Sequence, residues 1–278
     1  MVAAKTLKKE FPSVLDSAYE QYKRDLKRYK LVKEIMSKNV VTTTPEATMY
    51  EAARIMGEKH IGSLIVKKYD TAVGIVTERD LLSEVLAREK DMQEEKVEKI
   101  MSYPLVTICS TAKIKEAAQT MVNEKGRLAV FECGKLLGII TSSDLIRGLP
   151  EVNETKVKVD DFMTKRVITA DETTPVKAVA KTMGEQRIGS VIITRRGIAT
   201  GIFTERDLLT TLLAKAEPLE TNVGAQASSP LVTAPAGTSV HKAAATMAVK
   251  HIRRLPISEK GKLVGIVTAR DLVEAYAK

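Results

Sequence analysis

The sequence predicts an α/β fold built from four copies of one unit of strand, helix, strand, strand and helix. Three observations predict it: a nine-residue motif recurs four times in the 278 residues, an amphipathic helical pattern precedes each copy, and short apolar stretches flank that helix. The motif threonines Thr77, Thr141, Thr204 and Thr268 follow one another at steps of 64, 63 and 64 residues. A fixed period of this kind indicates a repeat architecture.

Each unit opens with a short apolar stretch that we expect to form a strand ending in threonine. These four threonines are Thr42, Thr107, Thr169 and Thr233. The next segment carries apolar residues at helical spacing, and the methionines among them are expected to be core residues. These positions are Met49, Ala52, Ala53 and Met56; Ile114, Ala117, Ala118 and Met121; Val176, Val179, Ala180 and Met183; and Val240, Ala243, Ala244 and Met247.

Two short strands, such as SLIV from Ser63 and AVGIV from Ala72, lead into the recurring motif, which reads GIVTERDLL at residues 74–82. A threonine followed three residues later by an aspartate, ahead of an apolar run, predicts a capped helix start. The whole unit has about 55 residues, which is small for an independent core. We therefore expect the units to bury their apolar faces against one another.

The four copies alternate in sequence. The first and third have IGS before the middle strand and TERD in the motif, whereas the second and fourth have Arg127 and Arg254 at the position of that serine. This alternation indicates that a two-repeat unit was duplicated. We expect repeats at residues 31–88, 97–149, 159–214 and 223–278, paired as modules 31–149 and 159–278. The Gly- and Pro-containing segment 147–158 is the expected boundary between the modules.

Composition narrows the class of protein. A net charge of +9 favours anionic partners, and the two cysteines, Cys109 and Cys133, suggest neither a disulfide framework nor a zinc ribbon. The sequence has no apolar run long enough for a membrane span and no signal-peptide core. Phosphate-loop, dinucleotide and HExxH motifs are absent, so we expect no catalytic residues, no metal and no required cofactor in a cytoplasmic protein.

The first 30 residues predict a basic amphipathic helix. Leu15, Tyr19, Tyr22, Leu26 and Tyr29 are spaced four, three, four and three residues apart, as in a heptad seam. Such a seam is expected to pack on its own domain or on a second copy of the chain. Nucleic-acid binding is the weaker alternative, because no recognised nucleic-acid module accompanies the helix.

From about residue 31 to residue 277 the chain resembles the CBS domain family, whose tandem pairs are called Bateman modules. The resemblance rests on the four G-h-h-T-x-x-D motifs, where h is apolar, each in a complete unit. Four repeats in one chain are similar to the plan of the gamma subunit of AMP-activated protein kinase and of stand-alone archaeal members. The resemblance implies two modules facing each other in a flat disk.

The resemblance also implies a regulatory protein that binds AMP, ADP or ATP between paired repeats and acts on an unidentified protein partner. S-adenosylmethionine is the alternative adenosyl ligand, and a homodimer is compatible with the family. Neither a membrane nor nucleic acid is expected as a partner. The net charge of +9 and the basic N-terminal helix leave nucleic-acid binding as an alternative.

Carried onto this chain, the resemblance implies four groups of site residues. The ribose acceptors are Asp80, Asp144, Asp207 and Asp271, and the ribose or phosphate contacts are Thr77, Thr141, Thr204 and Thr268. The phosphate contacts are His60, Arg79, Arg127, Arg187, Arg206, His251, Arg253, Arg254 and Arg270. The adenine or ribose contacts are Thr42, Ile61, Gly62, Thr107, Thr169, Ile188, Gly189 and Thr233.

These residues suit that chemistry. A carboxylate accepts hydroxyl donors, a helix start offers N–H groups to phosphate, and a planar guanidinium matches phosphate oxygens. The second repeat departs from the pattern, with SSD in place of ERD and Glu124 in place of His60, so its site is expected to be empty or altered. The first and third repeats, with TERD intact, are the first places to expect a nucleotide. His241 is expected to be structural.

Overall fold

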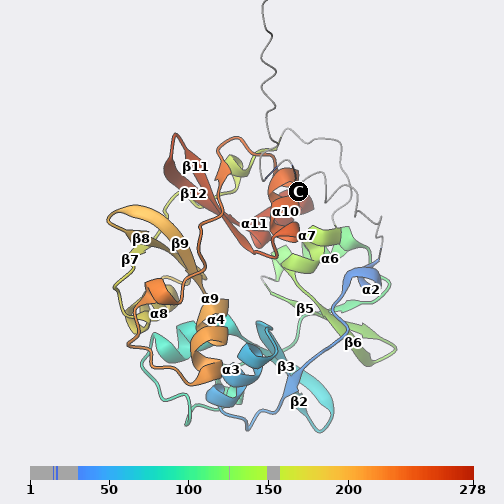
Figure 1. Cartoon of the computed structure of the whole chain (residues 1–278). Coiled ribbons are helices and arrows are strands. Elements are labelled where there is room, and N and C mark those ends of the chain that lie inside the picture. Colours follow the sequence, from blue (N-terminus) through green and yellow to red (C-terminus); the bar gives the residue numbers. More distant parts are fainter. Residues whose placement is uncertain (1–14, 16, 18–30, 125, 149–156) are drawn as a thin grey trace, which may run out of the picture.

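Four small mixed sheets, one for each repeat, form the framework of the protein. The computed structural model describes residues 15, 17, 31–124, 126–148 and 157–278. In every sheet the first strand is parallel to the second, and the second is antiparallel to the third. The repeats are arranged around a common centre (Figure 1). The α/β class and the paired repeats expected from the sequence are thus confirmed.

The bounds of the elements follow the predicted order in each repeat. The first repeat contains α2 (Val32–Ile35), β1 (Thr42–Thr43), α3 (Met49–Glu58), β2 (Ser63–Lys68), β3 (Thr71–Thr77), α4 (Glu78–Asp80) and η1 (Leu81–Leu86). The second contains α5 (Val97–Ile100), β4 (Thr107–Cys109), α6 (Ile114–Asn123), β5 (Leu128–Glu132), β6 (Lys135–Ile140) and α7 (Ser142–Gly148).

The second module repeats this order. The third repeat contains η2 (Val159–Asp161), β7 (Thr169–Asp171), α8 (Val176–Glu185), β8 (Ser190–Arg195), β9 (Ile198–Thr204), α9 (Glu205–Asp207), η3 (Leu208–Leu212) and η4 (Leu213–Lys215). The fourth contains η5 (Val223–Ala225), β10 (Ala234–Pro235), α10 (Val240–Val249), β11 (Arg254–Glu259), β12 (Lys262–Thr268) and α11 (Ala269–Ala277).

One local prediction is wrong. The first strand of each unit does not end at the threonine: β1, β4 and β7 begin there, and β10 begins one residue later. The apolar residue before the threonine can accept one hydrogen bond from the middle strand: Ile65 N donates to the carbonyl oxygen of Val41 at 3.1 Å. These preceding residues are not part of the strand itself. Three of them, Val41, Val106 and Ile168, line the cavities described below.

Within each module, the lead-in segment of one repeat pairs with the last strand of the other. Ser37 exchanges two backbone hydrogen bonds with Ile139, of 2.9 and 3.0 Å, and Ser102 does the same with Ile75. The methionine before the segment packs on the motif glycine of the partner repeat: a Cβ on Gly74 would lie 2.7 Å from Met101 Sδ. Paired repeats therefore complete each other, as their small size predicted.

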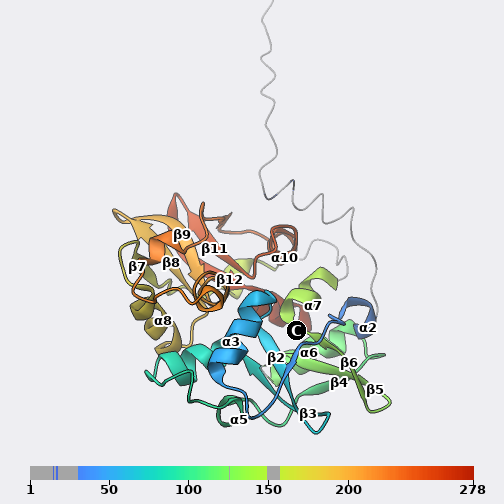
Figure 2. The ribbon, with the colours of Figure 1, turned by 60° about the horizontal axis from the view of Figure 1, so that its bottom comes forward.

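The two modules meet through their helices, and this joins repeats that are distant in sequence. One buried core unites the helices of repeats 1 and 3, and another unites those of repeats 2 and 4. The apolar helix positions predicted from the sequence, including all five methionines among them, are buried in these two cores. In the turned view, α3 of the first repeat and α7 of the second face the second module (Figure 2).

The predicted N-terminal helix lies outside the described residues except for Leu15 and Ser17. Leu15 is half-buried and packs against the core of repeats 2 and 4. Of the predicted boundary segment 147–158, residues 149–156 also lie outside the described part of the chain.

Candidate functional site

In all four repeats the motif threonine donates to the motif aspartate, and in repeats 1, 3 and 4 the aspartate N–H donates back to the threonine hydroxyl; Asp144 N donates to the carbonyl oxygen of Thr141 instead. In the first repeat, Thr77 N and Thr77 Oγ1 both donate to Asp80 Oδ2, at 2.8 Å each, and Asp80 N donates back to Thr77 Oγ1 at 3.3 Å. Thr204 with Asp207 and Thr268 with Asp271 repeat this geometry. The predicted capping box therefore exists, and it uses only one carboxylate oxygen.

The environment of the second carboxylate oxygen, Oδ1, differs among the repeats. Asp144 Oδ1 accepts from Arg147 Nη2 and, at 3.5 Å, from Ser37 Oγ. Asp207 Oδ1 accepts from Ser228 Oγ at 3.2 Å. Within the described residues, no such contact reaches Oδ1 of Asp80 or Asp271. These two aspartates keep an acceptor for an incoming hydroxyl group.

Burial also changes the acidity of these carboxyl groups. It raises the pKa of Asp80, Asp207 and Asp271, while the hydrogen bonds from the capping threonines lower the pKa and offset only part of that effect. A partly desolvated carboxylate gains from an additional hydrogen-bond donor. An additional hydrogen-bond donor would therefore stabilise the ionised form of these carboxyl groups.

Asp80 and Asp271 lie in one continuous cavity of about 530 Å³. Its first-module lining combines Thr77 and Asp80 of the first repeat with Pro104, Val106 and Gly126 of the second. Its second-module lining combines Thr268 and Asp271 of the fourth repeat with two segments of the third, namely Arg166, Val167 and Ile168, and Arg187, Ile188 and Gly189. The cavity thus draws residues from both repeats of each module.

A smaller cavity of about 270 Å³ contains Asp144. Its first-module lining includes Val41, His60, Ile61 and Gly62. The second module contributes side chains to the same cavity, namely Arg206, Met247, His251 and Arg253. Here the ion pair from Arg147 occupies the acceptor that Asp80 and Asp271 leave open. The sequence prediction of an altered second site has this contact as a physical basis.

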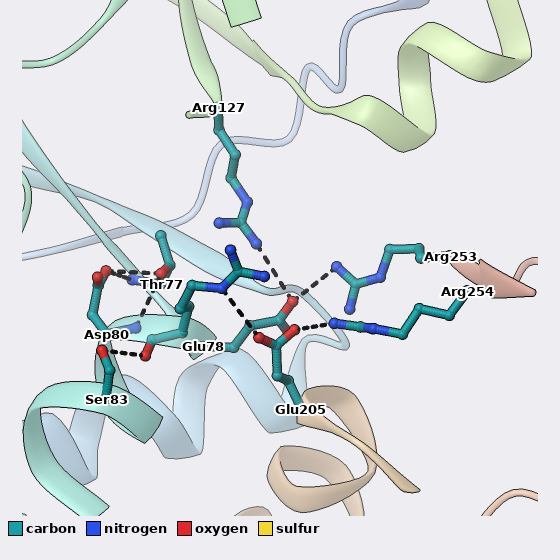
Figure 3. Close-up of polar contacts among 9 residues, drawn as sticks. Thr77, Glu78, Asp80, Ser83, Arg127, Glu205, Arg253 and Arg254 are labelled. Atoms are coloured by element: carbon teal, nitrogen blue, oxygen red, sulfur yellow. Dashed lines mark hydrogen bonds and ion pairs between the residues drawn. The ribbon is translucent and has the colours of Figure 1, made fainter. Parts of the chain in front are cut away.

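Side chains from all four repeats form a cluster of charges at the centre (Figure 3). Arg253 Nη1 and Arg127 Nη2 lie 2.9 and 3.4 Å from Glu78 Oε1. Arg254 Nη2 lies 2.5 Å from Glu205 Oε2, and Arg79 Nε lies 3.5 Å from Glu205 Oε1. All six side chains line the larger cavity. Four arginines and two glutamates leave the cluster a formal charge of +2, which suits an anion.

The glutamates of the cluster are nearly inaccessible, with 3% of Glu78 and 4% of Glu205 exposed. Burial raises the pKa of Glu205, but the nearby Arg254, Arg79 and Arg253 outweigh it and lower the pKa to about 2. Glu205 is therefore ionised at neutral pH. Its charge balances part of the positive charge that the arginines bring to the cavity.

Some of the remaining predicted site residues line one or both cavities, whereas Thr204 and Asp207 of the third repeat line neither of the two. Arg270 lines the larger one with the arginines already named. Thr141 lines both cavities. By contrast, Thr42, Thr107, Thr169 and Thr233 are exposed and are not among the lining residues of either cavity. The lining instead includes the residue before the threonine in three repeats, namely Val41, Val106 and Ile168.

Sequence reasoning missed Glu78, Glu205 and Arg147. A signal for the glutamates was present: repeats 1 and 3 have glutamate after the motif threonine, where repeats 2 and 4 have Ser142 and Ala269, and the latter repeats supply Arg127 and Arg254. This complementary alternation indicates ion pairs between unlike repeats. Nothing comparable pointed to Arg147, because i,i+3 pairs of opposite charge are common on exposed helices.

The CBS domain family matches residues 32–87, 97–151, 159–214 and 223–278. The chain therefore belongs to the CBS domain family, with four repeats that pair into two Bateman modules. Among the described residues, none of the helices combines the length and hydropathy of a membrane span. The same part of the chain places no three His, Cys, Asp or Glu side chains where they could hold a metal ion together.

Several relatives come from archaea. Uncharacterized protein MJ1225 of Methanocaldococcus jannaschii is 32% identical over 193 residues, which cover 64% of this chain and 68% of that protein. Uncharacterized protein MJ1404 of the same organism is 30% identical over 266 residues, covering 88% of this chain and 62% of that protein. This chain thus matches less than two thirds of MJ1404.

The crystal structure of MJ1225 superposes on this chain with a TM-score of 0.72 at 25% sequence identity. The match covers 88% of this chain and 99% of that one. MJ1225 is described there as a proposed archaeal homolog of g-AMPK. A Pyrococcus horikoshii protein superposes with a TM-score of 0.60 at 24% identity, which extends the likeness of the fold alone.

Proposed function

We propose that this protein is a regulatory sensor that binds adenine nucleotides, AMP, ADP or ATP, in the clefts between paired repeats. The observation that carries the proposal is the shared geometry of Asp80 and Asp271. Both aspartates line the same cavity. In each, the capping threonine donates hydrogen bonds to Oδ2, and no hydrogen bond from the described residues reaches Oδ1. A ribose offers two neighbouring hydroxyl donors for such an acceptor.

The arginine-rich centre supports a phosphorylated ligand. Arg127, Arg253 and Arg254 line the cavity that holds both aspartates, so a nucleoside seated on either aspartate has cations on the side of the cluster. Guanidinium groups form strong charge-assisted hydrogen bonds with phosphate oxygens. Membership of the CBS domain family and the likeness to MJ1225 support the same ligand class.

The geometry orders the four clefts. The Asp80 and Asp271 clefts are the proposed principal sites, because Ser228 already contacts Asp207 and Arg147 already pairs with Asp144. The TERD motif of the third repeat led us to expect one of the strongest nucleotide sites there. On the basis of these contacts, we rank the Asp207 cleft of the third repeat below the Asp271 cleft of the fourth. The nine predicted phosphate contacts and the lining residues Ile61, Gly62, Ile188 and Gly189 remain part of the proposal.

We further propose that the protein regulates an unidentified partner, without catalysis and without a required cofactor, in the cytoplasm. Nucleotide occupancy would act by favouring one arrangement of the modules, which requires unequal affinity for two arrangements. The shared cores of repeats 1 with 3 and 2 with 4 are the contacts that such a change would alter. A homodimer through the N-terminal region is part of the same hypothesis.

A thermal-shift panel of AMP, ADP, ATP, GTP and S-adenosylmethionine tests the proposed function. A ligand at 100 times its dissociation constant stabilises the folded state by about 2.7 kcal/mol, which raises the Tm by roughly 5 to 10 °C. We expect the shift with adenine nucleotides and its loss in Asp80→Ala combined with Asp271→Ala. A shift with S-adenosylmethionine alone would support the alternative ligand, and no shift with any compound would refute adenosyl sensing.

A further inference from the structure

The arginines of the central cluster are paired with protein carboxylates. Arg253 of repeat 4 and Arg127 of repeat 2 converge on the same oxygen of Glu78, from repeat 1. Arg254 and Arg79 pair with Glu205 from repeat 3. A phosphate group that uses these arginines must therefore compete with two internal anions. This conclusion rests on the proposed function.

The pairing around Glu78 is incomplete. Both arginines contact Oε1, whereas Oε2 is buried without a hydrogen-bond partner among the described residues, and so is Nη2 of Arg253. A buried donor without a partner costs free energy, which a further acceptor nearby would recover. Arg253 can thus gain from an additional oxygen, and the cluster as it stands is not its best-paired arrangement.

The glutamates are held in place more firmly than the arginines. The backbone N–H groups of Glu78 and Glu205 donate to the carbonyl oxygens of Gly62 and Gly189, at 3.1 Å each. A Cβ on Gly62 would lie 2.6 Å from Glu78 Oε2, so the carboxylate packs directly on the glycine backbone. The arginine side chains are longer, and three of them are partly exposed, with 22% of Arg127, 23% of Arg253 and 50% of Arg79 accessible, whereas Arg254 is 11% exposed. Movement in the cluster therefore falls to the arginines.

We infer that Glu78 and Glu205 are internal counterions that hold the cluster arginines in the ligand-free protein and that a ligand phosphate must displace from them. The glutamates then determine specificity through charge. A ligand without phosphate meets no competition, whereas a phosphorylated ligand gains the arginines and is repelled by the fixed carboxylates. Affinity for phosphorylated ligands is thereby held below what the arginines alone would give.

Glu78→Gln removes a buried charge, and we nevertheless expect it to tighten the binding of AMP. Glutamine keeps the size of the side chain and a carbonyl oxygen for Arg253, but it no longer repels phosphate. A unit charge within about 6 Å of a phosphate changes binding by at least tenfold at an effective dielectric constant near 20. We therefore expect AMP to bind Glu78→Gln at least about tenfold more tightly than the unmodified protein.

Isothermal titration of the full chain with AMP and with adenosine tests this inference. Adenosine carries the same base and ribose without phosphate, so its affinity is expected to be unchanged by Glu78→Gln. Glu95→Gln is the matched control, since Glu95 is also largely buried and pairs with Lys90 outside the cluster. This control is expected to leave both affinities unchanged.

Each result decides the inference. A tighter AMP affinity with an unchanged adenosine affinity supports it. An AMP-to-adenosine affinity ratio that stays the same or falls in Glu78→Gln overturns it while the proposed function stands. If neither compound binds the unmodified protein, the proposed function fails as well. Far-ultraviolet circular dichroism checks folding, and Glu205→Gln, expected to act in the same direction, replaces Glu78→Gln if that variant does not fold.

Discussion

The carbonyl oxygen of Leu209 lies 2.5 Å from the position that a Cβ on Gly57 would occupy. The same relationship joins Gly184 of the third repeat to Leu82 of the first, whose carbonyl oxygen would be the nearest atom to a Cβ on Gly184. At both places a helix of one module touches the backbone of a π-helical segment, η3 or η1, in the other module. Gly57 and Gly184 therefore allow the two modules to approach closely on opposite sides of the core that repeats 1 and 3 share.

Gly57→Ala is expected to lower the free energy of unfolding by about 1–3 kcal/mol, because the added methyl group overpacks the contact with a backbone oxygen that cannot rotate away. The steric cost opposes the gain in helix propensity, which is at most about 1 kcal/mol. Urea denaturation measures the difference. Gly126→Ala is the control, since among the described residues the nearest atom to its Cβ would be the carbonyl oxygen of Glu124, at 3.6 Å. Equal effects of the two substitutions would contradict the close fit.

Arg254→Leu is expected to destabilise the ligand-free protein by about 3 kcal/mol, because it leaves the buried Glu205 carboxylate without its nearest cation. The exposed i,i+4 pair of Arg54 and Glu58 gives the control: Arg54→Leu should change stability by less than about 1 kcal/mol. Urea denaturation compares the two variants. If Glu205 is responsible, adding Glu205→Leu to Arg254→Leu recovers part of the loss; a further loss would contradict this explanation.

Glu205 also gives stability a dependence on pH. Its pKa is lowered from 4.5 to about 2 in the folded protein, so the ionised form stabilises the folded state above about pH 4.5. That contribution is lost as the pH falls from about 4.5 towards 2. Asp80, Asp207 and Asp271 act in the opposite direction, because their pKa values are raised by burial.

The difference between the unmodified protein and Glu205→Gln isolates this contribution. Urea denaturation at pH 6 and pH 3 should show that the stability advantage of the unmodified protein shrinks at the lower pH. An advantage that is constant between the two values would mean that Glu205 does not titrate in this way.

Arg147→Ala is expected to open a further ligand site, because it releases Oδ1 of Asp144 from its ion pair. Isothermal titration with AMP should then give a higher number of bound ligands per chain. Ser83 occupies the corresponding position in the first repeat, three residues after Asp80, and donates to the carbonyl oxygen of Arg79 instead. Ser83→Ala should leave the number unchanged. An unchanged number in Arg147→Ala would show that this ion pair is not what closes the cleft.

Features set by local physics were predictable from the sequence. The capping boxes at Thr77, Thr204 and Thr268 need only residues three positions apart, and the buried methionines follow helical periodicity. The starts of the first strands were not predictable, because apolar residues such as Val41 favour a strand whether they pair in a ladder or line a cavity. Periodicity does not distinguish these two environments.

Contacts between modules were also beyond the sequence. Repetition indicated that the repeats pair, but not that repeat 1 packs on repeat 3 and repeat 2 on repeat 4. Glu78 and Arg253 lie in different modules, and no local pattern identifies one as the partner of the other. The order of the clefts could not be predicted either. Ser228 and Arg147 donate hydrogen bonds to the motif aspartates Asp207 and Asp144, but neither residue belongs to the motif.

The most direct test of the account is the titration of AMP into the unmodified protein and into the double variant Asp80→Asn, Asp271→Asn. Because burial raises the pKa of both carboxyl groups, neutral asparagines should not weaken the ligand-free fold. The account predicts that the unmodified protein binds AMP and that the double variant loses at least about tenfold in affinity, since each buried acceptor bond to ribose is removed. Equal affinity in the two proteins, or no binding of AMP to the unmodified protein, would contradict it.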